Sequence, residues 1–176
     1  MEEYKGVKFK VVQESGEISA EDAFAFVELD NSLGRFLHPE KNEGNLSIRV
    51  ATGFLIKCTG AMLTACNPRD AVLVTKIIGE EVHAIGGTPS SESMMHYAIY
   101  GKRKDANVIL HFHSDKLLGK PIGPEVGPFP YGTNELARAV SEAAENNNII
   151  RIKEHGLVIV AIDRDDLIRK MKELIK

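Results

Sequence analysis

The sequence predicts an α/β protein in which helices cover both faces of a mixed, largely antiparallel sheet, a three-layer α/β/α sandwich. Two observations predict it. Segments with an apolar period of two are interspersed with segments of helical period, and at least one pair of strands is joined by a tight turn. The 176 residues are 43% hydrophobic and 27% charged, an average composition for a globular domain, and they suffice to bury a core without disulfides or a structural metal. We therefore expect a single domain over residues 1–176.

The first half of the chain is expected to supply a helix, a hairpin and a further strand. Ser19 followed by Asp22 has the form of a capping box before apolar residues at helical intervals, and Pro39 ends that helix. Apolar and polar residues then alternate on either side of Gly53, which indicates a hairpin. The expected elements are a helix over 19–37, a polar loop over 40–44, strands over 45–50 and 54–56, and a strand over 71–75.

The second half begins with a helix that Pro89 opens, because proline lacks an N–H group and suits the first helical position after a cap at Thr88. Gly101 ends this helix. Apolar residues then alternate in three short runs and recur at helical intervals after Thr133 and Arg164. The expected elements are a helix over 89–101, a strand over 107–113, a helix over 133–145, strands over 149–152 and 157–162, and a helix from 164.

Charge and composition exclude several classes of function. Lys and Arg number 22 against 25 Asp and Glu, and the resulting net charge of −3 is too acidic for a protein that mainly neutralises nucleic-acid phosphates. No run reaches the roughly 18 apolar residues of a membrane-spanning helix, and the start MEEYKGVKFK is too charged for a signal peptide. We expect a cytoplasmic protein with neither a nucleic-acid nor a membrane partner. Cys58 and Cys66 lack metal-type spacing and are interpreted as ordinary thiols.

Three histidines are candidates for a metal site. His111 and His113 lie two apart on an expected strand, so both imidazoles project to the same side while Phe112 projects to the other. Such a pair also occurs in proteins without metal, and a site needs a third ligand. His155 occupies a turn between two expected strands, beside a glycine that permits a tight backbone. Three neutral imidazoles are a common catalytic zinc set that leaves one coordination position open.

The expected helix start at Pro89 is a second candidate. If Thr88 is the cap, the N–H groups of Ser90 and Ser91 are unpaired donors in the first turn, and their hydroxyls add to an anion pocket at the positive end of the helix dipole. The alternative is that these are simply residues that favour a helix start. Glu92, which follows, is a carboxylate placed to serve as a metal ligand or a general base.

Weaker indications lie at three other places. Gly44 with Asn45, and Thr59 with Gly60, fall at strand edges where glycine lets backbone N–H groups approach an anion, although such dipeptides are usually just turns. His96 shares a helix face with the carboxylate four residues before it, and we interpret it as structural because a lone helical histidine is usually only hydrogen-bonded.

Taken together and in this order, these segments resemble the class II aldolase/adducin N-terminal family. The matching segments are GNLSIRV from Gly44, CTG ending at Gly60, PSSESMMH from Pro89, DANVILHFHS from Asp105, YGTNELARAV from Tyr131 and KEHGLVIV from Lys153. They extend over about two thirds of the chain, and the set is too specific to arise by chance.

The resemblance implies a zinc-dependent lyase, an aldolase that cleaves a ketose 1-phosphate to dihydroxyacetone phosphate and an aldehyde through a metal-stabilised enediolate. Zinc, or another divalent metal, would be bound by His111, His113 and His155, and Glu92 would be a catalytic acid and base that also touches the metal. Phosphate and the adjoining ketose oxygens would be bound by Gly44, Asn45, Thr59, Gly60, Ser90 and Ser91. The family fold is an α/β/α sandwich, and members commonly form a homotetramer with sites at subunit interfaces.

The chain departs from the typical family aldolase in two segments. The family aldolases carry a proton-donating tyrosine in a segment after the histidine pair and another aromatic residue in a C-terminal extension, and we expect both pieces to be missing from this protein. Tyr131 occupies a position where relatives have an aromatic residue before Gly-Thr, and we interpret it as structural, although it is the nearest tyrosine that could replace the donor.

Three alternatives share the scaffold. Pentulose-phosphate epimerases that resemble the family carry Asp at the position of Glu92, so the Glu favours an aldolase. A dehydratase that acts on methylthioribulose 1-phosphate has the same Glu and the same three histidines, so the sequence does not exclude this alternative. A non-catalytic binding module of the adducin type is expected to have lost metal ligands, which this chain keeps.

Overall fold

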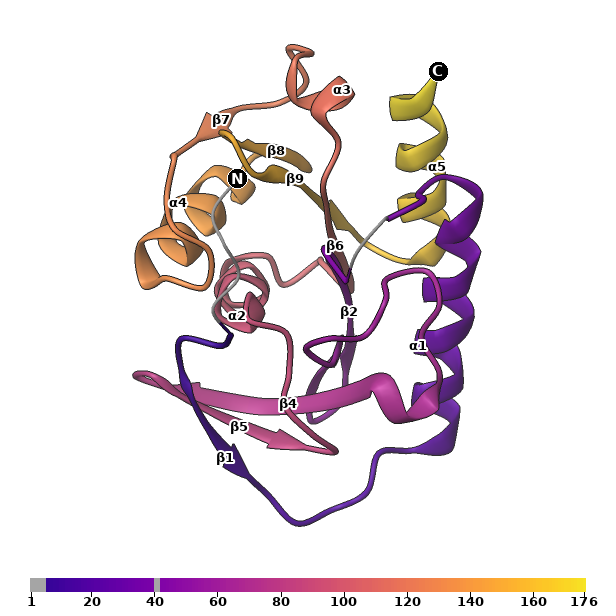
Figure 1. Ribbon diagram of the computed structural model, residues 1–176, viewed down its shortest axis with the longest axis vertical. Coiled ribbons are helices and arrows are strands. Elements are labelled where there is room, and N and C mark those ends of the chain that lie inside the picture. Colours follow the sequence, from indigo (N-terminus) through magenta and orange to yellow (C-terminus); the bar gives the residue numbers. More distant parts are fainter. Residues whose placement is uncertain (1–5, 40–41) are drawn as a thin grey trace.

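The computed structural model describes residues 6–39 and 42–176 (Figure 1). The start of the chain and the first two positions of the predicted 40–44 loop therefore lie outside the described residues. The strands form one sheet in the order β1-β5-β4-β3-β2-β6-β9-β8-β7. Their bounds are β1 Lys10–Gln13, β2 Asn45–Val50, β3 Gly53–Lys57, β4 Ala71–Ile78, β5 Glu81–Ile85, β6 Val108–Phe112, β7 Glu125–Val126, β8 Ile149–Ile152 and β9 Gly156–Ala161.

Strand pairing in this sheet is antiparallel except at its two ends. β1 pairs with β5, and β7 with β8, in parallel orientation, whereas every pair between them is antiparallel. The hairpin of β2 and β3 is confirmed, with Val50 opposite Gly53. The prediction of a mixed, largely antiparallel sheet is therefore confirmed.

Helices cover both faces of the sheet. The side chains of α2 (Ser93–Lys102) and α4 (Asn134–Ala144) pack in one apolar cluster, and those of α1 (Ala20–Ser32), α3 (Asp115–Leu118) and α5 (Arg164–Ile175) pack in another. Figure 1 shows α2 and α4 on one side of the central strands and α1 and α5 on the other. This arrangement confirms the three-layer α/β/α sandwich.

The two apolar clusters follow from the period of two in the central strands. In β3, Phe54 and Ile56 face α2, while Leu55 faces α1. In β9, Val158 and Leu157 divide in the same way between the two clusters, and all six β9 residues are buried. The sequence of β9 is a continuous apolar run, which is typical of a strand that is buried on both faces. β9 is therefore covered by helices on both sides of the sheet.

Most predicted helix ends are correct to within a residue or two, and the exceptions are the C-terminus of the first helix and the start of the helix predicted at Pro89. Ser19 caps α1 as predicted, accepting a hydrogen bond from the backbone of Asp22, and Thr133 caps α4 in the same way. The helix predicted over 19–37 ends at Ser32 and continues as a 3₁₀ turn over Leu33–Arg35. Gly34 lies in this turn, and glycine weakens an α-helix.

The elements that the sequence analysis missed are short or lie at the edges of the sheet. β5 follows a turn at Gly79 and pairs with the extended end of β4. Its buried side chains are Val82 and Ala84, a weak apolar pattern that alternation alone does not reveal. β1, β7 and α3 were also missed, the last two beside or within a glycine- and proline-rich stretch. Within the described ranges, no helix is long and apolar enough to cross a membrane.

Candidate active site

Three imidazoles meet where β6 ends. His111 is the penultimate residue of β6, His113 follows the strand, and His155 lies in the turn between β8 and β9. Because β6 pairs antiparallel with β9, with Phe112 opposite Leu157, the β8–β9 turn lies beside the end of β6. One ring nitrogen from each histidine lies within 4.8 Å of the others, and the ring centroids are 4.8–5.1 Å apart. The structure therefore brings the three predicted ligands together.

The Nε2 atoms of His111 and His113 converge, with a hydrogen bond orienting the first ring and a carboxylate lying beside the second. His111 Nδ1 donates to the carbonyl of Leu157 at 2.9 Å. The proton is therefore on Nδ1, and the lone pair on Nε2 can bind a metal ion. His113 Nδ1 lies 3.3 Å from a carboxylate oxygen of Glu43, and its Nε2 lies 3.2 Å from that of His111. Tetrahedral zinc with Zn–N bonds of about 2.05 Å separates its ligand nitrogens by about 3.3 Å. The spacing of the His111 and His113 nitrogens is thus that of two ligands of one tetrahedral metal ion, and the three imidazoles form a donor set that could hold a metal.

The rings pack together because residue 156 is glycine. A Cβ atom at Gly156 would lie 2.6 Å from the Phe112 carbonyl oxygen and 2.9 Å from ring carbons of both His111 and His113. Each of these distances is far below ordinary van der Waals contact. The glycine beside His155 therefore makes room for the imidazoles, a packing role that the sequence analysis did not foresee.

A buried carboxylate completes the cluster. Glu92 is 4% exposed, and its Oε1 lies 3.0 Å from Nε2 of His155. Its Oε2 lies 3.1 Å from Nε2 of His111 and accepts a hydrogen bond of 3.0 Å from the side-chain amide of Asn45. Two predicted site residues, Glu92 and Asn45, are therefore in direct contact, and the carboxylate faces the same space as the imidazole nitrogens.

The protonation states of this cluster suit a cation. Burial alone would raise the pKa of Glu92, but the adjacent rings of His111 and His155 and the hydrogen bond from Asn45 outweigh it and lower the pKa. Burial lowers the pKa of His111 to about 3 and also lowers the pKa of His113. An ionised carboxylate beside neutral imidazoles is the state in which these groups bind a metal ion.

The helix start predicted at Pro89 is wrong. α2 begins at Ser93, with Glu92 at its N-cap, because residues 88–90 stay extended and pair with the end of β3. Ser90 N–H donates to the carbonyl of Lys57 at 3.0 Å, so it is not the free first-turn donor that we expected. Both serines are nevertheless largely buried, at 6% and 9% exposure, immediately before the carboxylate.

The two glycine segments also lie near the cluster, Thr59–Gly60 through this pairing and Gly44–Asn45 through the pairing of β2 with β6. Thr59 N–H donates to the carbonyl of Thr88 at 3.0 Å, which places the Thr59–Gly60 turn beside the serines. Gly60 has φ +83°, and no atom of the described residues outside its own neighbours lies within 4 Å of a Cβ position, so the turn is open to that part of the chain. Gly44 has φ +74°, and a Cβ there would lie 2.8 Å from the carbonyl oxygen of His111. The six predicted substrate residues thus lie along the segments that border Glu92.

Comparison with known proteins agrees with this geometry. Residues 25–119 match the model of the family described as the class II aldolase and adducin N-terminal domain. The chain belongs to this family. It is 34% identical over 139 residues to the L-fuculose phosphate aldolase of Methanococcus maripaludis, covering 68% of this chain and 73% of that protein. It is 30% identical over 139 residues to the L-fuculose phosphate aldolase of Escherichia coli O157:H7, covering 68% of this chain.

The chain spans 63% of the length of the Escherichia coli relative. Solved structures of the family share its fold. YgbL from Klebsiella pneumoniae, described as a putative aldolase/epimerase/decarboxylase, superposes with a TM-score of 0.72 at 22% identity over 90% of this chain and 87% of that one. An L-fuculose 1-phosphate aldolase superposes with a TM-score of 0.71 at 22% identity over 89% and 83% of the two chains.

Two residues near the site of this family member escaped the sequence analysis. Glu43 lies beside His113, and no pattern in the sequence singles it out because residue 43 sits in a polar loop. Lys57 is only 2% exposed, and its ammonium donates to the carbonyls of Ala61 at 2.6 Å and Asn42 at 3.3 Å. Burial lowers the pKa of Lys57. A lysine at the end of a strand is usually exposed, so its burial beside the Thr59 turn could not be foreseen.

Tyr131 has the structural contacts that we expected of it. Its ring is 5% exposed, its hydroxyl donates to the carbonyl of Gly6 at 3.2 Å, and the Lys8 ammonium lies 3.9 Å from the ring centroid. These contacts attach the residues before β1 to the loop that precedes α4. The hydroxyl is therefore engaged by the protein's own backbone.

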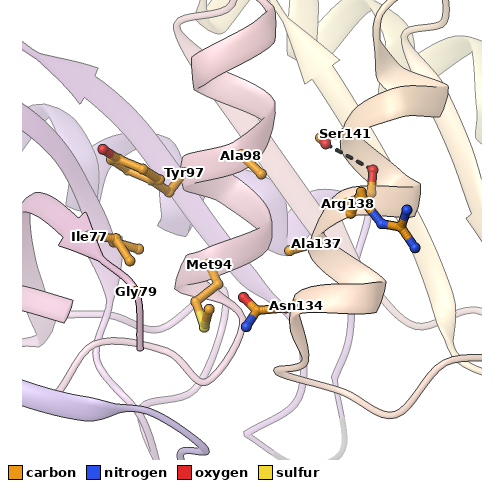
Figure 2. A pocket seen from close by; sticks show the side chains of 9 residues that line it. All are labelled: Ile77, Gly79, Met94, Tyr97, Ala98, Asn134, Ala137, Arg138 and Ser141. Atoms are coloured by element: carbon orange, nitrogen blue, oxygen red, sulfur yellow. Dashed lines mark hydrogen bonds between the residues drawn. The ribbon is translucent and has the colours of Figure 1, made fainter. Parts of the chain in front are cut away.

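A groove of about 350 Å³ lies on the outer side of α2, away from the imidazoles. Figure 2 shows Ala98 on the side of α2 that faces Ala137 of α4, whereas Tyr97 points to the other side, toward Ile77. None of the residues lining this groove is a predicted site residue. The groove is lined mainly by apolar side chains and is separate from the candidate active site.

Proposed function

We propose that this protein is a zinc-dependent aldolase, a carbon–carbon lyase that cleaves a ketose 1-phosphate to dihydroxyacetone phosphate and an aldehyde. The observation that carries the proposal is the cluster in which an ionised, buried carboxylate lies 3.0 and 3.1 Å from ring nitrogens of two of three converging imidazoles. Family membership and the similarity to L-fuculose phosphate aldolases support it. A binding module without catalytic function has no need of such a cluster.

His111, His113 and His155 would hold the metal, each through one ring nitrogen. Zinc bound there would act as a Lewis acid on the substrate's carbonyl and hydroxyl oxygens and stabilise the negative charge that develops as the C3–C4 bond breaks. The hydrogen bond from His111 to the Leu157 carbonyl keeps that ring in one tautomer. Fixed rings limit the reorganisation needed when substrate enters.

Glu92 would move the proton. When the C3–C4 bond breaks, C4 leaves as the aldehyde carbon and the proton of its hydroxyl is lost, while protonated Glu92 delivers one proton to C3 to complete dihydroxyacetone phosphate, so the protons balance. In the reverse direction the carboxylate removes the same proton from C3. The hydrogen bond from Asn45 fixes Oε2 of Glu92, and Oε1, which lies 3.0 Å from Nε2 of His155, would carry the proton. Loss of a general acid and base typically costs about 10²–10⁴-fold in rate.

The substrate's phosphate would lie against the Ser90–Ser91 and Thr59–Gly60 segments, bound by hydroxyls and by backbone N–H groups at the open turn. Ser90 would act through its hydroxyl, since its N–H is already bonded to Lys57. Asn45 Oδ1 is buried and has no hydrogen-bond partner within residues 6–39 and 42–176, so it is available to accept from a ketose hydroxyl. Gly44 keeps the backbone next to it close to the site.

The remaining parts of the proposal concern the whole protein. We propose a single-domain cytoplasmic enzyme that uses a small sugar phosphate and assembles as a homo-oligomer, a tetramer by family resemblance. In such an assembly a neighbouring subunit would supply the group that accepts the C4 hydroxyl proton during cleavage and returns it in the reverse direction, because the Tyr131 hydroxyl is engaged by the Gly6 carbonyl.

The test is turnover of a panel of ketose 1-phosphates by zinc-loaded wild type and by Glu92→Gln. Gln keeps size and hydrogen bonding but removes proton transfer, so we expect dihydroxyacetone phosphate release to fall about 10²-fold or more while zinc stays bound. Glu81→Gln is the matched control, because Glu81 lies on β5 and pairs with Lys10 at the far end of the sheet. Equal activity of wild type and Glu92→Gln, or dehydration or epimerisation without cleavage, would overturn the proposal.

A further inference from the structure

Among the hydrogen bonds that join β2 to α2, two lie nearest the imidazoles, at the N-cap and in the first turn of the helix; we call them the upper and the lower bond. The upper bond runs from the Asn45 amide to Glu92 at 3.0 Å. The lower bond joins Ser47 Oγ to Nδ1 of His96 at 2.7 Å. The upper bond ends on the proposed acid and base, whereas the lower one touches neither metal ligand nor substrate residue. The lower bond therefore needs an explanation of its own.

The two bonds match in spacing. Asn45 and Ser47 lie on the same side of β2, two residues or about 6.8 Å apart along the strand. Glu92 and His96 lie four residues or about 6 Å apart along the first turn of α2. Strand and helix therefore run alongside each other for this length with matched attachment points. A helix held at two such points can neither slide along the strand nor rotate about a single contact.

The lower attachment is buried and uncharged. Ser47 and His96 are fully buried, and Ser47 Oγ is also 2.9 Å from the hydroxyl of Tyr100, which is 4% exposed. Burial lowers the pKa of His96 to about 4, so the ring is neutral at neutral pH. Placing these polar groups in the core is unfavourable unless they are hydrogen-bonded, so they favour one position of α2 over others.

We infer that Ser47 and His96 are positioning residues that fix the first turn of α2 on β2 and thereby hold Glu92 against the metal-binding histidines. β2 pairs directly with β6 on its other side, with Asn45 opposite His111. The distance from Glu92 to His111 is thus set by two neighbouring strands and the attachment of α2 to one of them. Among the described side-chain hydrogen bonds from β2, the Asn45 bond holds the N-cap of α2 and the Ser47–His96 bond holds its first turn. Loss of the lower bond would leave the N-cap end of α2 held to β2 by Asn45.

The experiment compares His96→Leu with His96→Asn. Both side chains branch at Cγ and have the same number of heavy atoms, but only Asn places a polar atom where Nδ1 lies, within reach of Ser47. The first readout is the side-chain amide resonance of Asn45 in the metal-free, ¹⁵N-labelled protein. We expect wild-type shifts in His96→Asn and shifts toward those of solvent-exposed asparagine in His96→Leu, because Glu92 has moved away from the amide.

The second readout rests on the proposed function. Misplacement of a catalytic group by about 1 Å costs about 10²-fold, so we expect kcat of His96→Leu to fall about 10–100-fold with little change in KM, and His96→Asn to restore it. Stability should follow the opposite order, since Leu fills the apolar site without an unpaired polar atom. A merely structural role predicts that activity and stability change together.

Controls separate the possible failures. Tyr100→Phe removes the second hydrogen bond of Ser47 to α2 but keeps the Asn45–Glu92 and Ser47–His96 bonds, so its Asn45 resonances and kcat should match wild type. Ser47→Ala removes the lower bond from the strand side and replaces His96→Leu if that variant does not fold. Unchanged Asn45 resonances in His96→Leu and Ser47→Ala would overturn the inference. Absence of turnover in wild type would count against the proposed function alone, since the resonances test positioning without activity.

Discussion

Gly156→Ala is expected to damage the metal site and the fold together. The added Cβ would lie 2.6 Å from the Phe112 carbonyl oxygen, where a carbon–oxygen contact is normally about 3.3 Å. It would also lie 2.9 Å from Cε1 of His111, the carbon bonded to the Nε2 atom that faces the other rings. Relief requires β9 or the rings to move by roughly half an ångström or more, since both neighbours are themselves buried.

The magnitude follows from these distances. Insertion of one methyl group into a packed interior costs about 1–3 kcal/mol of unfolding free energy, and for a chain of this size each kcal/mol lowers Tm by about 2–4 °C. Metal–ligand distances tolerate only about 0.2 Å of displacement, and disturbances of the groups that orient the ligands weaken metal binding about 10–100-fold. We therefore expect lower stability of the metal-free protein and weaker zinc binding.

Urea unfolding of the metal-free protein and calorimetric zinc titration measure the two effects. Gly101→Ala is the matched control: Gly101 lies in α2 with no atom within 4 Å of a Cβ position, so the same substitution should stabilise the protein by about 0.5–1 kcal/mol. The reasoning is refuted if Gly156→Ala unfolds like wild type and binds zinc with wild-type affinity.

Further predictions concern individual residues. His111→Ala should lose the single zinc ion that we expect in protein purified without chelator, and equal metal content by elemental analysis would contradict the ligand assignment. Ser91→Ala should weaken competitive inhibition by inorganic phosphate by about tenfold, corresponding to one lost hydrogen bond, and unchanged inhibition would contradict the proposed phosphate site. Tyr131→Phe should keep kcat near wild type while unfolding with about 1 kcal/mol less free energy in urea. Thr133→Ala should cost about 1 kcal/mol through loss of the α4 cap, and an unchanged urea midpoint would contradict that role.

Periodicity and capping residues predicted most of the sandwich. Thr133 marks the start of α4, and the alternation around Gly53 predicts the β2–β3 hairpin, because each feature depends on residues close together in the sequence. β5 was missed because its pairing with β4 is decided by the partner strand rather than by its own weak pattern. Pro89 was misassigned for the same reason: its segment bonds to the end of β3, a partner that local preference cannot reveal.

In the candidate site, too, features set by neighbouring residues in the sequence could be predicted, and features set by tertiary contacts could not. The strand pair His111 and His113 is visible in the sequence because an interval of two fixes their common face. The burial of Lys57 and the packing role of Gly156 depend on strands that meet only after folding, so neither could be predicted. Asn45 was selected from a weak dipeptide, and its bond to Glu92 depends on the position of α2 relative to β2.

The three imidazoles come from two distant stretches of the chain, and this affects the order in which the protein folds and binds metal. As the chain leaves the ribosome, His111 and His113 emerge together, and His155 follows only after α4 and β8 have been made. Two imidazoles alone retain a metal weakly, so firm capture waits until β9 has paired with β6 at the centre of the sheet. Metal uptake would then come after folding rather than guide it. A metal ion bound by all three histidines would link β6, which is synthesised first, to the β8–β9 turn, which is synthesised later. The fraction of molecules that bind metal would therefore report the fraction in which β9 has paired with β6.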